Sequence, residues 1–70
     1  MNCYLIEEGS LVKFIEAANL NTFGWTPQRQ NAVGVVTGVN NIGGKPWYNI
    51  LFSVDATPVR VFHKDVALFS

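Results

Sequence analysis

The sequence has little charge, one cysteine and one histidine, and each shortage argues against a class of protein. Charged residues make up 14% of the chain, against roughly 25% in an average soluble domain, and the formal net charge is zero. A neutral chain is a weak candidate for non-specific nucleic-acid binding, which is largely electrostatic. A single cysteine forms no intrachain disulfide, and one cysteine with one histidine does not supply the four ligands of a structural zinc site. We therefore expect neither a disulfide scaffold nor a metal centre.

Motifs that would indicate catalysis or a cofactor are also missing. Gly43–Gly44 lacks the flanking pattern of a phosphate-binding loop. His63 and Asp65 have no nucleophile beside them, so we interpret Asp65 as the cap of a turn and His63 as a packing residue. Glu7–Glu8 interrupts the apolar start of the chain, so we expect no signal peptide, and no segment is long enough to span a bilayer. The sequence predicts a chain that is not an enzyme and holds no cofactor.

Small size and high apolar content together predict association with another protein chain. Seventy residues form one domain at most, so residues 1–70 are interpreted as a single domain. A domain this small hides only about 60% of the surface that its unfolded chain exposes. Hydrophobic residues nevertheless make up 49% of the chain, and we expect some of them to contact a partner. The alternative is that they are scattered over the surface, as in many monomers.

Period-two patterns predict strands in the second half of the chain. In AVGVVTGV, residues 32–39, β-branched residues alternate with glycines, and glycines inside a strand indicate a bend, a bulge or the close approach of another backbone. NNIGGK, residues 40–45, predicts a tight turn because Asn and Gly tolerate positive φ. Pro46 then introduces a strand over residues 47–54. Its alternation predicts an inward face made of Tyr48, Ile50, Phe52 and Val54.

The remaining segments predict further short elements. DATP, residues 55–58, is a turn signal. A strand over 59–64 follows, then a helical turn over 64–66 and a last strand over 67–69. GSLVKFIEA, residues 9–17, fits a strand with Val12 and Phe14 inward and Lys13 outward. It also fits a helix with Ser10 as N-cap. We favour the strand because a barrel needs a first strand to close.

A long connection joins this first strand to the second. It runs over residues 17–31 without a clear period and carries Phe23 and Trp25 beside a glycine and a proline. Connections of this length are uncommon in compact domains and are often functional. Its aromatic residues would either cover one mouth of a barrel or face a partner, and the sequence leaves both open.

The order of these elements resembles that of SH3-like barrels. GSLVKF resembles the opening strand of such barrels, VGVVTGV is similar to a strand of KOW-type modules, and VRVFHKDVALF resembles their closing strand, helical turn and last apolar pair. The resemblance implies an all-β fold: a small SH3-like five-stranded barrel with a long first loop and a short helical turn before the last strand.

The arrangement as a whole is similar to a group of small, mostly uncharacterised proteins of tailed bacteriophages, especially cyanophages. The resemblance covers residues 9–69 and implies a virion component or an accessory protein, located in the host cytoplasm or the virion. The aromatic loop is longer and more apolar than a minimal member of the group would need. Plasmid-borne dihydrofolate reductases share the topology, but their Val-Gln-Ile-Tyr strand corresponds here to residues 59–62, VRVF. Because the glutamine and the tyrosine are absent, a reductase that forms a barrel tetramer is only a remote alternative.

These patterns predict a structural or interaction module that forms a homo-oligomer or docks onto a larger protein assembly. Aromatic side chains on the long loop and on the outward face of the 47–54 strand are the candidate contacts. The predicted partner-binding residues are Phe23, Trp25, Trp47, Asn49 and Leu51. The alternative is a KOW-type nucleic-acid-binding module, which would use basic residues together with Trp47. Its predicted contacts are Lys13, Lys45, Arg60 and Lys64.

Overall fold

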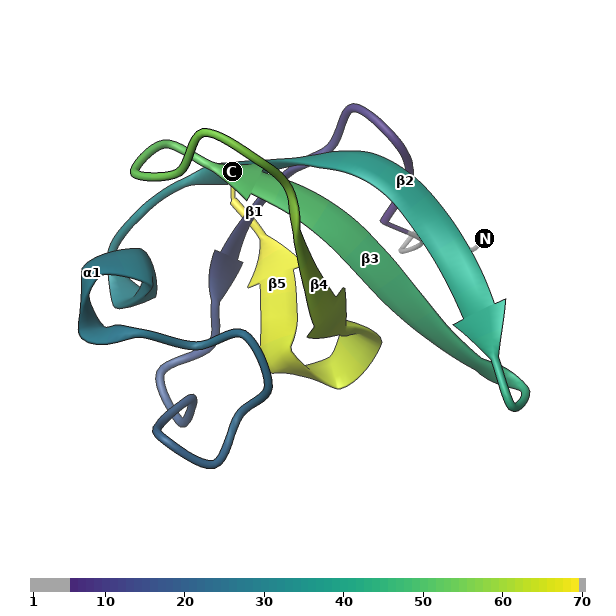
Figure 1. Ribbon diagram of the computed structural model, residues 1–70, viewed down its shortest axis with the longest axis horizontal. Helices are drawn as coiled ribbons and strands as arrows, with labels where there is room; N and C mark the ends of the chain where they lie inside the picture. Colours follow the sequence, from purple (N-terminus) through teal and green to yellow (C-terminus); the bar gives the residue numbers. More distant parts are fainter. Residues whose placement is uncertain (1–5, 70) are drawn as a thin grey trace.

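Five antiparallel strands form one sheet in the structure, a computed structural model that describes residues 6–69 (Figure 1). The strands are β1 (Leu11–Phe14), β2 (Gly34–Ile42), β3 (Lys45–Phe52), β4 (Val59–Phe62) and β5 (Val66–Leu68). Their order across the sheet is β4-β3-β2-β1-β5. A 3₁₀ turn, η1 (His63–Asp65), joins β4 to β5, and a one-turn helix, α1 (Pro27–Gln30), interrupts the long first loop. The predicted all-β fold is confirmed, although no pairing between β4 and β5 closes the sheet within the described residues.

The core lies on the inner face of this curled sheet. Tyr48, Ile50 and Phe52 of β3 are buried there, as the alternation predicts, and the Phe52 ring stacks on Phe14 of β1 at 5.2 Å between centroids. Val54 was predicted to continue this face, but that prediction is wrong, because its side chain is 54% exposed. The strand ends at Phe52, whose carbonyl accepts a hydrogen bond from the amide of Asp55 in a turn. The period therefore stops before it reaches Val54.

The first strand resolves the choice between strand and helix over residues 9–17. β1 is shorter than predicted, with Val12 and Phe14 buried and Lys13 on the outer face. Val12 lies opposite Gly34 of β2 on one side and Leu68 of β5 on the other. Two neighbouring strands thus satisfy the backbone groups of β1, which a helix would have satisfied within itself.

Glycines shape β2 in two of the ways that the sequence predicts. A Cβ at Gly34 would collide with Ile50 and lie 2.9 Å from the ring of Phe52, so β2 crosses the core closely at this point. The register with β3 shifts between Val36 and Gly38, which marks a β-bulge. Beyond the bulge, β2 and β3 continue as a long hairpin that extends past the rest of the sheet, to its lower right in Figure 1.

The turn of this hairpin is shorter than the predicted 40–45 segment. Only Gly43 and Gly44 form it, with φ of 59° and 81°. Two positive φ values define a type I′ turn, whose twist matches that of the flanking strands. The strands therefore run up to Ile42 and resume at Lys45.

The bounds of the last three elements, β4, η1 and β5, differ from the predicted bounds by one or two residues. The strand predicted over 59–64 stops at Phe62, and the helical turn occupies His63–Asp65 instead of 64–66. Val66 then opens β5, one residue early, because its buried side chain lies opposite Phe14. Burial of this valine against β1 fixes where the turn ends.

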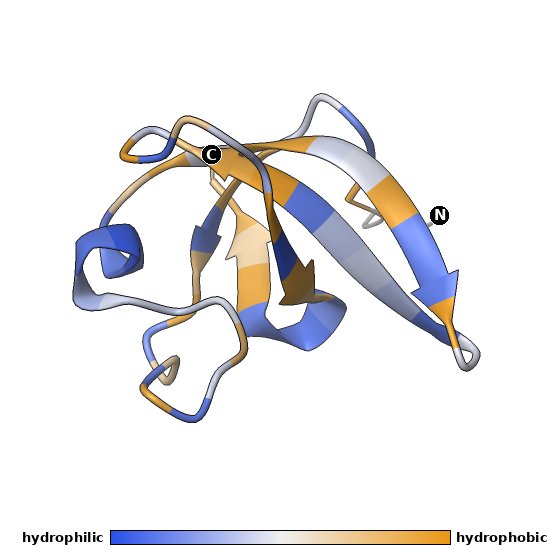
Figure 2. Cartoon of the chain, in the orientation of Figure 1, coloured by the Kyte–Doolittle hydropathy of each residue, from blue (hydrophilic) through white to orange (hydrophobic). Residues whose placement is uncertain are grey.

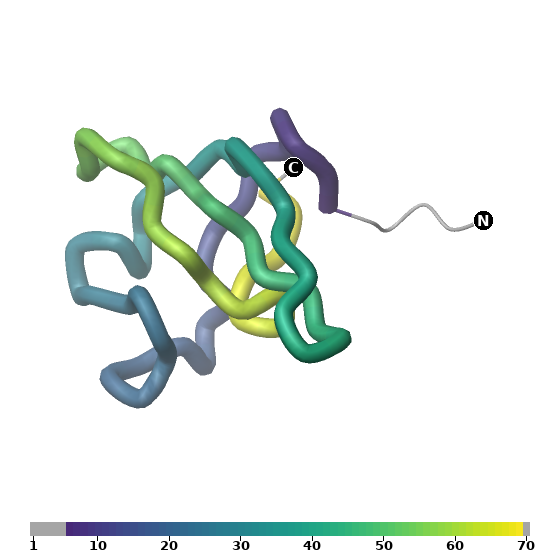
Figure 3. Tube along the Cα trace, turned by 45° about the vertical axis from the view of Figure 1, so that its right-hand side comes forward, coloured from purple at the N-terminus to yellow at the C-terminus, as the bar shows by residue number. Residues whose placement is uncertain are grey.

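The long first loop is anchored to the core at both ends, through the buried side chains of Ala18 and Ala32. It carries α1, which begins after the N-cap Thr26 with Pro27 in its first turn. No residue of α1 is buried, and its ribbon has the blue of hydrophilic residues in Figure 2. Figure 3 shows the loop folded back beside the sheet, and the segment between Ala18 and α1 brings Phe23 to the sheet.

Candidate partner-binding surface

Three of the predicted partner-binding residues lie on the outer face of β3, opposite the buried core. Trp47, Asn49 and Leu51 alternate with the buried side chains of the same strand, and each is partly exposed. Trp47 lies opposite Phe62 of β4, and Asn49 lies opposite Arg60. Because opposite residues of an antiparallel pair project to the same face, β4 extends the outer face of β3.

A row of rings, which we call the aromatic cluster, runs across this surface and is made of Phe23, Trp47, Phe62 and His63. The ring of Phe23 lies 5.8 Å from that of Trp47, at 87°. Trp47 lies 5.0 Å from Phe62, and Phe62 lies 4.7 Å from His63, both in edge-to-face geometry. Phe23 remains 59% exposed. The loop and the outer face are thus joined through rings that are still open to solvent.

Trp25 is placed differently from the other predicted contacts. Its side chain is half-buried and packs against the core, and its indole N–H donates a hydrogen bond to Oε1 of Gln30. A tryptophan whose polar atom is bonded within its own loop has its apolar part available for packing. Trp25 therefore supports the loop from beneath and is not part of the aromatic cluster.

Polar contacts hold the loop in this position. Nε and Nη2 of Arg29 donate to the two carboxylate oxygens of Asp55, at 2.8 and 3.0 Å, and Nη1 donates to the carbonyl of Gly24 at 2.7 Å. Gln30 donates from Nε2 to the carbonyl of Ile15, at 3.0 Å. The paired geometry of guanidinium and carboxylate gives direction as well as energy. These bonds tie α1 to the turn after β3 and to the end of β1.

Gly24 brings the loop against the edge of β4. Its φ is +83°, and a Cβ added there would lie 2.9 Å from the carbonyl oxygen of Arg60 and 3.0 Å from Cγ1 of Val59. The loop backbone thus covers the outer edge of the sheet and places the preceding residue, Phe23, beside Trp47. The sequence analysis did not single out Gly24, Arg29 or Asp55 as site residues. A glycine beside an aromatic pair was the only local signal, since the partners of Arg29 are distant in sequence.

The structure brings together only some of the predicted nucleic-acid contacts. Lys45 and Arg60 share the outer face with Trp47, each two residues along its strand from the Trp47–Phe62 pair. Lys64 is exposed in η1. Lys13 lies on β1, with its ammonium 5.5 Å from the ring centre of Phe69, and β2 and β3 separate it from β4. Of the four basic residues, Lys45 and Arg60 are the two that the strand pairing places beside Trp47 and Phe62.

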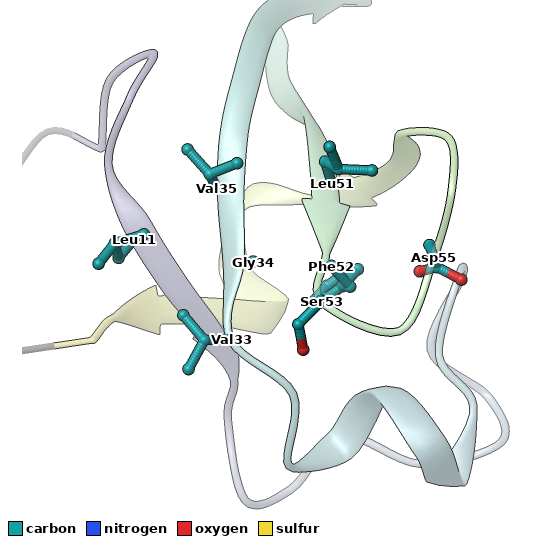
Figure 4. Close-up of a pocket in the computed structure, with 8 residues that line it drawn as sticks. All are labelled: Leu11, Val33, Gly34, Val35, Leu51, Phe52, Ser53 and Asp55. Carbon is teal, nitrogen blue, oxygen red and sulfur yellow. The ribbon is translucent and has the colours of Figure 1, made fainter.

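An open depression of about 450 Å³ lies on the outer face of β1, β2 and β3. Leu11, Val35 and Leu51 follow one another across these three strands, and Figure 4 shows them with Asp55 at the rim. Only Ser53 and Asp55 add polar side-chain atoms, and Asp55 is engaged by Arg29. A reaction site needs several convergent polar groups, so this depression favours apolar contact over chemistry.

The remaining observations concern Tyr48, metal ligands and helix length. Burial raises the pKa of the Tyr48 hydroxyl, which lies on the inner face. Within residues 6–69, no three His, Cys, Asp or Glu side chains come together as metal ligands. No helix in the same part of the chain is long and apolar enough to cross a membrane.

No protein family, curated protein or solved structure matches the chain.

Proposed function

We propose that this protein is a non-enzymatic interaction module that binds another protein through the aromatic cluster. One observation carries the proposal: Phe23 is held against Trp47 by a braced loop and is still 59% exposed. Exposure of a large aromatic side chain gains nothing for folding, because its hydrophobic surface stays in water. A partner that covers it would gain that burial.

The bracing of the loop adds to the case for binding. Arg29 and Gln30 donate four side-chain hydrogen bonds, which tie the loop to Gly24, to Asp55 and to Ile15. A surface that is already ordered loses less conformational entropy when a partner binds. Tryptophan is enriched among the residues that dominate interface energies, and Trp47 stands at the centre of the cluster.

The apolar character of the remaining surface agrees with an assembly role. Several large apolar side chains besides Phe23 are exposed: Leu11, Leu20, Val39, Ile42, Val54, Leu68 and Phe69. The resemblance to small barrels of tailed bacteriophages supports a virion component or an accessory protein as the setting. In that setting the protein works in the host cytoplasm or the virion, as a homo-oligomer or docked onto a larger assembly.

The test compares Phe23→Ala with Leu20→Ala, because both residues lie on the same loop and Leu20 is 85% exposed outside the cluster. Each variant and the wild type are immobilised, and proteins retained from an infected-cell extract are identified. We expect a partner that the wild type and Leu20→Ala retain and that Phe23→Ala loses. With the purified partner, Phe23→Ala should weaken binding by more than about fivefold. If the two variants bind the partner equally well, the aromatic cluster is not part of the interface.

A KOW-type nucleic-acid-binding module is the second candidate, because Lys45 and Arg60 flank the Trp47–Phe62 pair on one face. Homopolymeric single-stranded DNA is the probe, measured by the fluorescence of the tryptophans over a range of salt. Under this alternative, binding weakens steeply with salt and with Arg60→Gln. Lys13→Gln, on the outer face of β1, shows whether the contact extends beyond β3 and β4. Absence of binding at low salt eliminates this candidate.

A further inference from the structure

The hairpin arm of β2 has an edge that no strand covers within the described residues. β1 pairs with β2 only at Gly34 and Val35, and the last contacts are the bonds between Val36 and the 9–10 turn. Residues 37–42, which we call the open edge, have β3 as their one neighbouring strand among the described residues, and Gly38 to Ile42 pair with it. The segment spans about 20 Å at the usual rise of a strand. This is the length of an ordinary strand partner.

The open edge carries few of the features that protect strand edges from pairing. Natural edges are usually blocked by charged side chains, by proline, by bulges or by shortness. TGVNNI has no charged residue and no proline, and its bulge lies at the near end, before Val39. Val39 is 49% exposed and Ile42 is 44% exposed. The edge is therefore long, uncharged and partly apolar.

Hairpin geometry identifies which backbone groups face outward. The two-residue turn at Gly43–Gly44 makes Ile42 and Lys45 the hydrogen-bonded pair that closes it. Hydrogen-bonded and non-bonded pairs alternate along an antiparallel ladder. Asn40 therefore bonds to β3, whereas the N–H and C=O groups of Val39 and Asn41 point to the open edge. Pro46, which has no N–H to donate, lies opposite Asn41 and agrees with this assignment.

We propose that two copies of this chain associate by antiparallel pairing of their open edges about a two-fold axis at Asn40. Val39 of each copy then lies opposite Asn41 of the other, and each of these pairs exchanges two backbone hydrogen bonds, four in all. The same register keeps the inner and outer faces of both sheets continuous, because paired residues have matching orientation. It also places Ile42 of each copy opposite Gly38, where the missing side chain leaves room.

A second copy fits this edge better than an unrelated strand. A two-fold contact requires a segment that complements itself, and this one offers equal numbers of outward donors and acceptors on either side of its centre. The absence of charge removes the repulsion that two identical charged edges would feel. The proposal specifies the contact for the homo-oligomer arm of the function proposed above. It uses the backbone edge of β2, one strand beyond Trp47, which lies opposite Asn40. Separate variants therefore test this contact and the aromatic cluster.

The test follows backbone amide exchange in the full chain by NMR, at about 20 µM and about 1 mM, a range that brackets a weak interface of small area. We expect the amides of Val39 and Asn41 to exchange at least about tenfold more slowly at the higher concentration, where sedimentation detects a dimer. The amide of Asn40 should be protected at both concentrations, since it bonds within the hairpin. It serves as the internal control for folding.

Charge variants test the register. Val39→Lys with Asn41→Lys places like charges opposite each other and should abolish the dimer, whereas Val39→Lys with Asn41→Glu places opposite charges there and should retain it. Fast exchange at Val39 and Asn41 at every concentration overturns the proposal. Protection at every concentration that disappears when residues 1–5 are deleted also overturns it, because the chain would then cover its own edge. Phe23→Ala should leave the exchange pattern unchanged, which separates this test from that of the aromatic cluster.

Discussion

Gly24 offers the sharpest test of how the long loop is held against the sheet. The substitution Gly24→Ala adds one methyl group where φ is +83° and where a backbone carbonyl, that of Arg60, lies 2.9 Å from the new atom. The carbonyl belongs to β4, whose pairing with β3 limits how far it can move. Neither the loop nor the strand can adjust without breaking contacts that brace the aromatic cluster.

Two costs and one gain set the expected magnitude. A left-handed backbone costs about 1–2 kcal/mol for a residue with a Cβ. Overpacking against a fixed neighbour costs about 1–3 kcal/mol more. The unfolded chain loses some conformational freedom, which offsets about 0.4–1 kcal/mol. We therefore expect Gly24→Ala to lower the free energy of unfolding by about 1–4.6 kcal/mol, which is large beside the roughly 3–5 kcal/mol available to a domain of this size.

Gly9→Ala is the matched control. Gly9 has a similar φ of +93°, but nothing lies within 4 Å of an added Cβ. Gly9→Ala has the same backbone cost and the same offset but no collision, so it should lower the free energy of unfolding by about 0–1.6 kcal/mol. Urea denaturation followed by tryptophan fluorescence measures both variants. If the two free-energy losses agree within about 0.5 kcal/mol, the close approach of the loop to β4 is refuted.

Two further predictions concern the loop brace and the core. Arg29→Met and Asp55→Asn should each destabilise the protein by about 1–3 kcal/mol, since both side chains are mostly buried and share charged hydrogen bonds. Their double mutant should lose less than the sum of the two, by roughly 1 kcal/mol in a denaturation cycle, whereas strict additivity would contradict a direct pair. Burial raises the pKa of Tyr48 above its ordinary 10.0, so the folded state keeps this proton where the unfolded chain releases it. The free energy of unfolding should be unaffected by this group below pH 10 and fall above it, and Tyr48→Phe should reduce that fall in a pH series of melts.

Most features of the sheet could be predicted from the sequence because they depend on local residue patterns. Period-two alternation identified the buried face of β3 up to Phe52, since burial on one side of a strand leaves a period of two. It failed at Val54 because a turn, and not the pattern, ends the strand. Glycines within a strand predicted a bend, a bulge or a close approach without deciding among them. The structure has a close approach at Gly34 and a bulge before Gly38.

Less of the candidate partner-binding surface could be predicted from the sequence. Trp47 was predicted to face outward with the loop aromatics beside it, and the structure places Phe23 there. Phe23 and Trp25 have the same local character, and nothing in the sequence separated them. The division between them depends on which ring the braced loop turns toward the core.

The sequence by itself determined the approximate positions of most strands and turns and the inward face of β3 up to Phe52, since strand period and turn residues act over a few neighbours. Only the tertiary structure decided the rest: the bond between Arg29 and Asp55, the contact of Gly24 with β4, the aromatic cluster and the open edge. Each of these joins segments that are distant in the chain, or depends on how far two strands overlap. The free energies of these contacts depend on strand register and on the entropy of closing loops between distant segments. A short stretch of sequence determines neither of them.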